Sequence, residues 1–345
     1  MMMCSYSLNK YCNHSVTLTI KVVLIPMALK RNKMDGICKI LDGGLASQLV
    51  ANGYSSIDSD PLWSARLLHT NPAAIQNAHQ QFLKAGADIL ETNTYQVSIE
   101  GFKDYLSLSG EKTLQCIQES VTKLVKPLVE ECERNTGRSV SIAGSIGPYG
   151  ACQHDGSEYT GNYLDSMTVQ QLMDWHRPRL QALSEAGVDM FAFETIPGAK
   201  EGEALVQLLQ QEFPQQKAWL SFTCKDGSHT SHGELLVDAV KSGIDCDQIT
   251  HVGVNCVAPD LVESLLLSLQ VYRDKKPFIV YPNSGGFWKS GKGWDADTKL
   301  SNIESFVSSC VRNGAKVIGG CCKVTHTEIE AMRIALDKLK LRGDC

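Results

Sequence analysis

Eight short apolar segments recur along the chain, and a longer segment with helical spacing of apolar residues follows each of them. The segments are CKILDGG (38–44), ADILETNTY (87–95), VSIAGSIGP (140–148), VDMFAFETIP (188–197), AWLSFTCKD (218–226), HVGVNC (251–256), PFIVYPNSGG (277–286) and KVIGGCC (316–322). Near-continuous apolar strands that alternate with helices indicate a parallel sheet covered on both faces. Eight such units in about 300 residues predict a single-domain α/β protein with a (β/α)8 barrel of the TIM type.

The alternative architecture is an open, doubly wound sheet. No Gly-x-Gly-x-x-Gly motif follows the first apolar segment, so a dinucleotide site has little support. Helix signals fit either fold. Asn71 precedes Pro72 as an N-cap, and that helix is expected to stop at Gly86. Thr168 and Gln171 form a capping box for a helix that runs to Gly187, which Pro178 could kink or split.

The first residues differ in charge from the rest of the chain. Residues 1–34 hold five basic and no acidic side chains, whereas the remainder carries all 38 acids and 28 of the 33 bases. We therefore interpret residues 1–36 as an extension and residues 37–340 as the barrel domain. The extension resembles a mitochondrial transit segment, and the plainer alternative is a disordered or mis-assigned start in a cytoplasmic protein.

The composition excludes two broad classes of function. No apolar run reaches the roughly 20 residues that a membrane span requires. The formal net charge is -5 and, beyond the N-terminus, no basic block suggests a nucleic-acid partner. Thirteen cysteines with irregular spacing indicate reduced thiols rather than a secreted disulfide framework.

Polar and thiol side chains stand where the predicted strands end. In a (β/α)8 barrel these carboxyl ends meet at one rim, which carries the active site. The rim residues are Asp42, Glu91, Thr92, Asn93, Ser145, Glu194, Thr195, Cys224, Asn255, Cys256, Asn283, Ser284, Cys321 and Cys322. The sequence therefore predicts acids, amides and thiols at a single rim.

Three of these cysteines could converge. Cys256 ends the sixth strand and Cys321 and Cys322 end the eighth, so one strand separates them in a closed barrel. Three protein ligands and one open position are typical of a catalytic zinc. We expect Gly319 and Gly320 to let the backbone turn tightly there. The alternatives are buried structural thiols and a strained disulfide between Cys321 and Cys322 that serves as a redox switch.

A zinc ion with three thiolates has a net charge near -1, which makes it a poor activator of water. Such a site is better suited to hold a fourth thiolate, from a substrate, in its deprotonated form. A cation that loses its charge on reaction is the natural electrophile for an anionic site. The sequence therefore indicates methylation of a thiol by a sulfonium donor.

Several motifs together resemble the homocysteine S-methyltransferase family, especially the branch that uses S-methylmethionine or S-adenosylmethionine. The resemblance covers roughly residues 37–337. It is carried by LDGGLASQL, ADILETNTYQ, GSIGPYGA with GSEYTGNY, FETIP, GVNC, YPNSGG with Trp288, and GGCC. The chain departs from the family after the two cysteines, where Lys323-Val324-Thr325-His326 replaces a basic residue, two threonines and a proline.

The resemblance implies that Cys256, Cys321 and Cys322 bind Zn²⁺, and that these three cysteines and Glu194 take part in catalysis. It implies that Asp42 and Glu194 bind the ammonium group of homocysteine, although Glu194 could instead only cap the next helix. The remaining substrate-binding positions are Gly43, Thr92 and Asn93, which match the amino-acid pocket, and Asn255 and Asn283, which are expected to orient loops or ligands.

The segment GSIGPYGACQHDGSEYTGNY (144–163) follows the third strand and offers rings and acids to a sulfonium donor. Tyr149, Glu158 and Tyr159 are candidates for that role, with ordinary loop packing as the alternative. Betaine-using relatives are expected to resemble the chain less, and to carry a longer C-terminal arm for oligomer contacts. We therefore expect a monomer or weak homo-oligomer.

The resulting hypothesis is a zinc-dependent enzyme that moves a methyl group from S-methylmethionine or S-adenosylmethionine to homocysteine and forms methionine. Two alternatives stay open: an enzyme that uses betaine, and a non-catalytic barrel that binds zinc or senses the thiol redox state.

Overall fold

The apolar segments form strands that are shorter than the apolar runs themselves, because the polar rim residues lie beyond the last ladder pairs. The computed structural model describes residues 38–285, 288–289, 293–294 and 300–343, so the predicted extension (1–36) lies outside the described residues. The strands of the main sheet are β1 (Lys39–Ile40), β2 (Ile89–Glu91), β3 (Ser141–Ile146), β4 (Met190–Ile196), β5 (Ala218–Phe222), β6 (Ile249–Asn255), β7 (Phe278–Tyr281) and β10 (Ala315–Ile318). Each of these strands overlaps one of the eight predicted segments.

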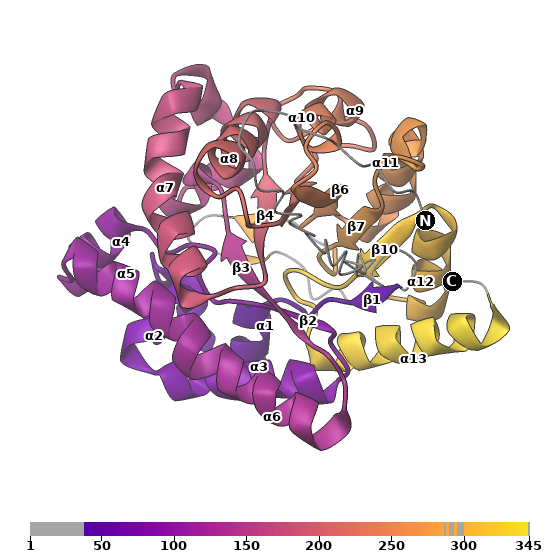
Figure 1. The fold of residues 1–345 in the computed structure, drawn as a ribbon, viewed down its shortest axis with the longest axis horizontal. Coiled ribbons are helices and arrows are strands. Elements are labelled where there is room, and N and C mark those ends of the chain that lie inside the picture. Colours follow the sequence, from indigo (N-terminus) through magenta and orange to yellow (C-terminus); the bar gives the residue numbers. More distant parts are fainter. Residues whose placement is uncertain (1–37, 286–287, 290–292, 295–299, 344–345) are drawn as a thin grey trace, which may run out of the picture. The chain divides into compact units, whose positions relative to one another are not determined.

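All neighbouring strands are parallel, in the order β1-β10-β7-β6-β5-β4-β3-β2. The two ends of this order also meet, since Leu41 and Ile89 form a parallel bridge and the Asp42 amide donates to the Ile89 carbonyl at 3.1 Å. Figure 1 shows the strands in the middle with helices around them. The (β/α)8 barrel is confirmed, and the open doubly wound sheet is wrong because the first and second strands pair.

The helices lie between the strands along the chain. They are α1 (Leu45–Ala51), α2 (Leu67–Thr70), α3 (Pro72–Lys84), α4 (Ile99–Leu106), α5 (Gly110–Glu119), α6 (Lys126–Thr136), α7 (Val169–Ala186), α8 (Ala199–Glu212), α9 (Leu236–Ala239), α10 (Lys241–Ile244), α11 (Val262–Ser268), α12 (Ile303–Arg312) and α13 (His326–Arg342). Asn71 caps α3 by accepting from the Ala74 amide, and Thr168 and Gln171 form the predicted capping box. Pro178 lies inside α7 without ending it.

Glycines lie at the ends of three helices that lead directly into a strand, namely α3, α7 and α12. Gly86, Gly187 and Gly314 have φ values of 100°, 81° and 98°, a left-handed conformation that a side chain disfavours. This conformation turns the chain from the helix back into the barrel. The predicted pattern of helix end, glycine and buried strand is therefore confirmed.

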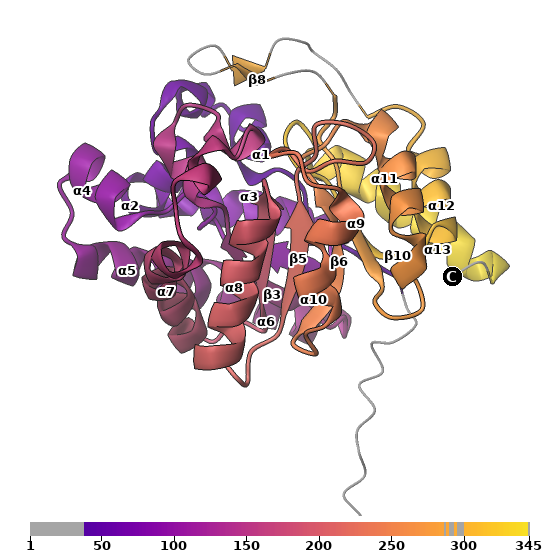
Figure 2. The same ribbon diagram turned by 90° about the horizontal axis from the view of Figure 1, so that it is seen from above.

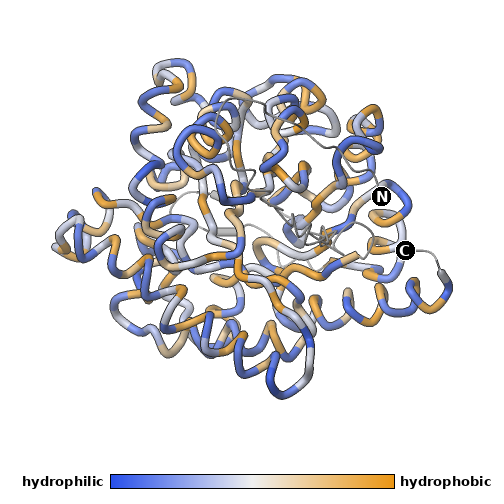
Figure 3. The backbone as a smooth tube through the Cα atoms, viewed as in Figure 1, coloured by the Kyte–Doolittle hydropathy of each residue, from blue (hydrophilic) through white to orange (hydrophobic). Residues whose placement is uncertain are grey.

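Two apolar layers hold the barrel together. One fills its interior and includes Leu41, Ile89, Trp219 and Tyr281, while a larger one packs the outer strand faces against the helices. In Figure 3 the outer helices alternate between hydrophilic and hydrophobic residues, as expected for helices with one buried face. None of the described helices is long and apolar enough to cross a membrane.

A small hairpin was not predicted. β8 (Trp288–Lys289) and β9 (Gly293–Trp294) pair antiparallel in the connection between β7 and α12. Figure 2 shows β8 outside the barrel.

Candidate active site

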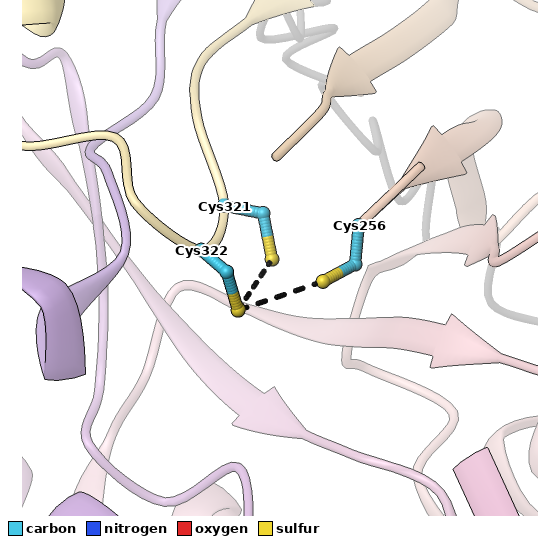
Figure 4. A group of neighbouring side chains, drawn as sticks. All are labelled: Cys256, Cys321 and Cys322. Carbon is cyan, nitrogen blue, oxygen red and sulfur yellow. Dashed lines mark hydrogen bonds between the residues drawn. The ribbon is translucent and has the colours of Figure 1, made fainter. Parts of the chain in front are cut away.

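Three thiols meet at the carboxyl ends of β6 and β10 (Figure 4). The Sγ atoms of Cys256 and Cys322 lie 3.7 Å apart, those of Cys321 and Cys322 lie 4.0 Å apart, and all three lie within 4.8 Å of one another. Cys256 and Cys322 are buried and Cys321 is partly buried. We call these three residues the thiol cluster. Cys321 and Cys322 are free thiols in this structure and do not form the alternative disulfide.

The barrel backbone itself fixes the thiol cluster. The Cys256 amide donates to the Tyr281 carbonyl at 3.1 Å, and the Cys321 amide donates to the Pro282 carbonyl at 2.8 Å. Cys256 has a φ of 50°, a conformation that residues with side chains seldom adopt and that turns the chain sharply after β6. The thiols therefore stand on backbone that is paired between β6, β7 and the segment after β10.

The two glycines before Cys321 are needed for a reason other than the predicted one. Neither Gly319 nor Gly320 has a positive φ. A Cβ on Gly320 would lie 2.1 Å from Val324 Cγ1, and a Cβ on Gly319 would lie 2.6 Å from Leu41 Cβ. The glycines thus allow close packing of the strand end rather than an unusual turn.

The geometry of the thiol cluster fits a tetrahedral metal ion. Ligands about 2.3 Å from a tetrahedral zinc lie about 3.8 Å from one another, close to the separations of these sulfurs. Hydrogen bonds from Cys321 and Cys322 hold the pKa of Cys256 well below its usual value, whereas the proximity of Cys256 raises the pKa of the other two thiols. A soft metal ion would supply the positive charge that favours the thiolate form of all three side chains.

A second group of side chains lies in the same cavity, which has a volume of about 280 Å³. Asp42, Glu91 and Glu194, which we call the carboxylate cluster, come from the ends of β1, β2 and β4. Asp42 Oδ2 accepts from the Glu91 amide at 3.0 Å, and Ser145 Oγ donates to Glu194 Oε1. Asp42 Oδ1 and Glu91 Oε1 are buried and have no hydrogen-bond partner among the described residues.

The carboxylate cluster lacks a counter-ion. Burial raises the pKa of Asp42 and of Glu91 well above their usual values, and it raises the pKa of Glu194 to about 7. The described residues that line the cavity include no lysine or arginine. Buried carboxylates without a cationic partner are costly, so the pocket is suited to bind a cation such as a substrate ammonium group.

The other predicted amino-acid residues fall into two groups. Gly43, Thr92 and Asn93 line the cavity, although the Asn93 amide is paired with Ser64 through bonds of 2.8 and 2.9 Å. The Thr92 hydroxyl accepts from the Ser145 amide at 3.0 Å. Thr92 and Asn93 thus hold the cavity wall as well as facing the cavity.

Asn255 and Asn283 act on neighbouring backbone. Asn255 Oδ1 accepts from the Thr195 amide and its Nδ2 donates to the Thr195 hydroxyl, both at 2.7 Å. Thr195 has a φ of 57°, so this clamp holds the strained turn that follows Glu194. Asn283 Oδ1 accepts from the Gly285 amide at 2.8 Å. Neither asparagine is among the residues that line the cavity.

The loop between β3 and α7 (147–168) supplies another part of the cavity wall. Tyr159 and Glu158 line the cavity, and the Tyr159 hydroxyl lies 3.4 Å from Cys256 Sγ. Burial, with a contribution from the nearby Cys256, raises the pKa of Glu158 to about 7. Tyr149 does not line the cavity; it lies at the base of the loop, where its ring packs against Tyr163 and Trp175 with centroids 5.3 and 5.2 Å apart.

The sequence left Glu91 without a role, although it placed this residue at the rim. A signal was present, since residues two apart on a strand share a face and Ile89 points into the barrel interior. The same alternation puts Glu194 on the interior face of β4, two residues beyond Ala192. Trp63 and Tyr95, whose ring centroids are 6.4 Å apart, also line the cavity and were not predicted.

Comparisons with known proteins identify the family of the chain. Residues 39–336 match the family described as Homocysteine S-methyltransferase. A betaine-homocysteine S-methyltransferase from Drosophila melanogaster is 40% identical over 87% of this chain and 94% of its own length. The homocysteine S-methyltransferase 2 of Zea mays is also 40% identical, over 87% of this chain and 90% of its own. The expectation that relatives named for betaine are less similar is therefore wrong for the Drosophila protein.

A solved structure is similar as well. The metallated form of the homocysteine methyltransferase MmuM from Escherichia coli superposes with a TM-score of 0.75 at 34% identity, covering 87% of this chain and 96% of that one. The family match spans most of the chain, and both relatives exceed the identity at which common descent is secure. The chain belongs to the homocysteine S-methyltransferase family and is a methyltransferase of that class.

Proposed function

We propose that this enzyme transfers a methyl group from a sulfonium donor, S-methylmethionine or S-adenosylmethionine, to the thiol of L-homocysteine in a zinc-dependent reaction that forms methionine. The observation that carries this proposal is the content of one cavity. It contains the thiol cluster, whose sulfur atoms lie within 4.8 Å of one another, and the carboxylate cluster, with no lysine or arginine among the described lining residues. A substrate with a thiol at one end and an ammonium group at the other matches both clusters.

In this proposal Cys256, Cys321 and Cys322 hold the zinc, which would supply the positive charge that keeps the homocysteine thiol deprotonated. The carboxylate cluster binds the ammonium group of homocysteine and so directs its sulfur toward the thiols. Asp42 Oδ1 and Glu91 Oε1, which have no hydrogen-bond partner among the described residues, would accept from that ammonium. Glu91 is thus added to the two residues that the sequence predicts.

The donor is proposed to enter from the side of the β3–α7 loop. Its sulfonium would lie near Tyr159 and Glu158, since an aromatic face and a carboxylate both favour a cation. The homocysteine sulfur then forms a bond to the methyl carbon while the bond from that carbon to the sulfonium sulfur breaks and its electron pair stays on the leaving sulfur. The donor loses its positive charge, so the thioether product is held less tightly.

Betaine is the second candidate donor, because the Drosophila relative at 40% identity carries that name. Betaine presents a quaternary ammonium, which an aromatic wall and carboxylates also favour. Its three methyl groups require more room around the cation than a sulfonium does.

The test is a donor panel with zinc-loaded protein and L-homocysteine as acceptor, in which methionine formation is followed for S-methylmethionine, S-adenosylmethionine and betaine. We expect at least one sulfonium to be turned over faster than betaine. Equal or faster turnover of betaine would overturn the donor assignment and leave the acceptor assignment standing. An absence of methionine with all three donors would reject the proposed function.

A further inference from the structure

A buried carboxylate outside the cavity holds the base of the β3–α7 loop. Glu201 lies in the first turn of α8 and is fully buried. Its Oε1 accepts from the Tyr149 amide at 2.7 Å and contacts His176 Nε2 at 2.9 Å, while its Oε2 accepts from the Tyr163 hydroxyl. One side chain therefore connects the start of the loop, the short helical turn Asn162–Asp165 near its end, and helix α7.

Helix α7 reinforces the same point with two buried residues. His176 is fully buried, and burial lowers its pKa although Glu201 opposes that shift, so it is a neutral donor to the carboxylate. Arg179, one turn further along, donates to the Gly147 carbonyl at 3.1 Å and to the Tyr95 carbonyl at 2.8 Å. A buried carboxylate that lost one of its three hydrogen-bond partners would be left partly unsatisfied, at a cost in free energy. The contacts of Glu201 therefore favour a single position of the loop.

The loop is packed so tightly that the position of its base also determines where its cavity-facing residues lie. A Cβ on Gly150 would lie 2.6 Å from Tyr163 Cε1 and 2.7 Å from the Glu158 amide nitrogen. The Tyr163 ring and the backbone of Glu158 are thus in contact with the same residue at the base of the loop. Tyr159, the next residue, brings its hydroxyl within 3.4 Å of Cys256 Sγ.

We propose that Glu201 is a positioning residue for the methyl donor: its carboxylate clamps the base of the β3–α7 loop and thereby fixes Glu158 and Tyr159 against the thiol cluster. This inference rests on the proposed function for its link to the donor. Glu201 touches no lining residue of the amino-acid pocket by hydrogen bond, so its loss should spare homocysteine binding. It should instead loosen the loop and weaken donor binding.

The test compares Glu201→Gln with Glu203→Gln in the zinc-loaded, full-length protein. Glu203 lies on the same helix, is exposed, and its carboxylate accepts a hydrogen bond from the Gln207 side chain. In Glu201→Gln an amide NH₂ replaces one acceptor oxygen and faces a donor. We expect the donor KM to rise about tenfold or more, with the homocysteine KM changed less than about twofold and zinc retained. Glu203→Gln should match the wild type.

Hydrogen–deuterium exchange gives a readout that does not depend on turnover. Amides between residues 149 and 163 should exchange faster in Glu201→Gln and not in Glu203→Gln, while those of β4 and β5 stay unchanged. Unchanged exchange in the loop, or equal rises in both KM values, would overturn the inference. If the wild type formed no methionine from homocysteine with either sulfonium donor, the proposed function would fail and the exchange result alone would decide whether the clamp exists. Tyr163→Phe, which removes a single hydroxyl, provides a milder variant should Glu201→Gln not fold; it should show the same changes at smaller size.

Discussion

The thiol cluster and the β3–α7 loop meet at the wall of the cavity, but different forces hold them. Cys256 and Cys321 stand on amides that are hydrogen-bonded to the ends of neighbouring strands, so the barrel fixes them directly. Glu158 and Tyr159 stand on a long connection that side chains from α7 and α8 hold in place. We therefore expect changes near the thiols to affect metal and acceptor binding, whereas changes around the loop should affect donor binding.

The largest effect is expected from the thiols. Replacing Cys256, Cys321 and Cys322 together by alanine should remove most bound zinc, expected at about one ion per chain, and all methionine formation. The fold should survive, because apolar side chains of the strands and helices form the two layers that hold the barrel together. Zinc analysis and circular dichroism check this. Full zinc retention in the triple variant would show that the metal binds elsewhere, and Cys310→Ala is the matched control for loss of a buried thiol in the core.

A smaller but selective effect is expected from the carboxylate cluster. Glu194→Gln keeps the shape and removes the charge, so the homocysteine KM should rise about tenfold to hundredfold, as for the loss of a charged hydrogen bond. Zinc content should stay the same, and the donor KM should change little. Steady-state kinetics in both substrates measures this. If thiols that lack the amino group were methylated as well as homocysteine, the ammonium role would be wrong.

The opposite selectivity is expected on the loop. Glu158→Gln should raise the donor KM roughly threefold to tenfold, because one of several groups near the cation loses its charge. The homocysteine KM should stay within about twofold of the wild type. A variant that raised both values equally would break the comparison between the two walls, and Glu203→Gln again serves as the control.

The smallest effect on the site is expected from His79, which belongs to neither wall. It is fully buried in α3, both ring nitrogens lack a hydrogen-bond partner among the described residues, and burial lowers its pKa to about 4. The unfolded chain binds that proton near pH 6.5, so stability is fully present above about pH 6.5 and falls as the pH drops toward 4. His79→Leu should make urea unfolding depend less steeply on pH between 6.5 and 4, by up to about 1.4 kcal/mol per pH unit.

Neither zinc content nor the two KM values should change in His79→Leu at neutral pH. His251, whose pKa is also lowered to about 4 by burial, keeps part of the dependence in the variant. An identical pH dependence of the free energy of unfolding in variant and wild type would show that His79 does not contribute to it.

Most of the barrel follows from local pattern. The strands could be predicted because each is a buried apolar run, and Gly86, Gly187 and Gly314 mark the helix ends by a conformation that glycine favours. The proximity of Cys256, Cys321 and Cys322 could be predicted because the strand order of a barrel brings their strand ends together. The short hairpin β8–β9 escaped prediction because its strands of two residues carry no periodic signal.

The buried side chains that hold the β3–α7 loop in place could not be predicted in the same way. Glu201 and His176 lie in amphipathic helices, where an acid and an imidazole are normally expected on the exposed face. Their burial results from the way α7 packs against α8 beside the loop, a long-range contact that local spacing does not encode. Tyr149 was predicted for the cavity from its residue type, but its backbone position at the Glu201 clamp places it at the loop base.

The central claim is that the thiol cluster holds a metal that binds the acceptor sulfur, while the carboxylate cluster binds the amino group. Calorimetric titration of homocysteine and of homoserine, into zinc-loaded and zinc-stripped protein, tests it most directly, because the two ligands differ only at the sulfur position. We predict that homocysteine binds the zinc-loaded protein at least tenfold more tightly than homoserine does, and that this preference disappears when zinc is removed. Equal affinities of the two ligands for the zinc-loaded protein would contradict the account.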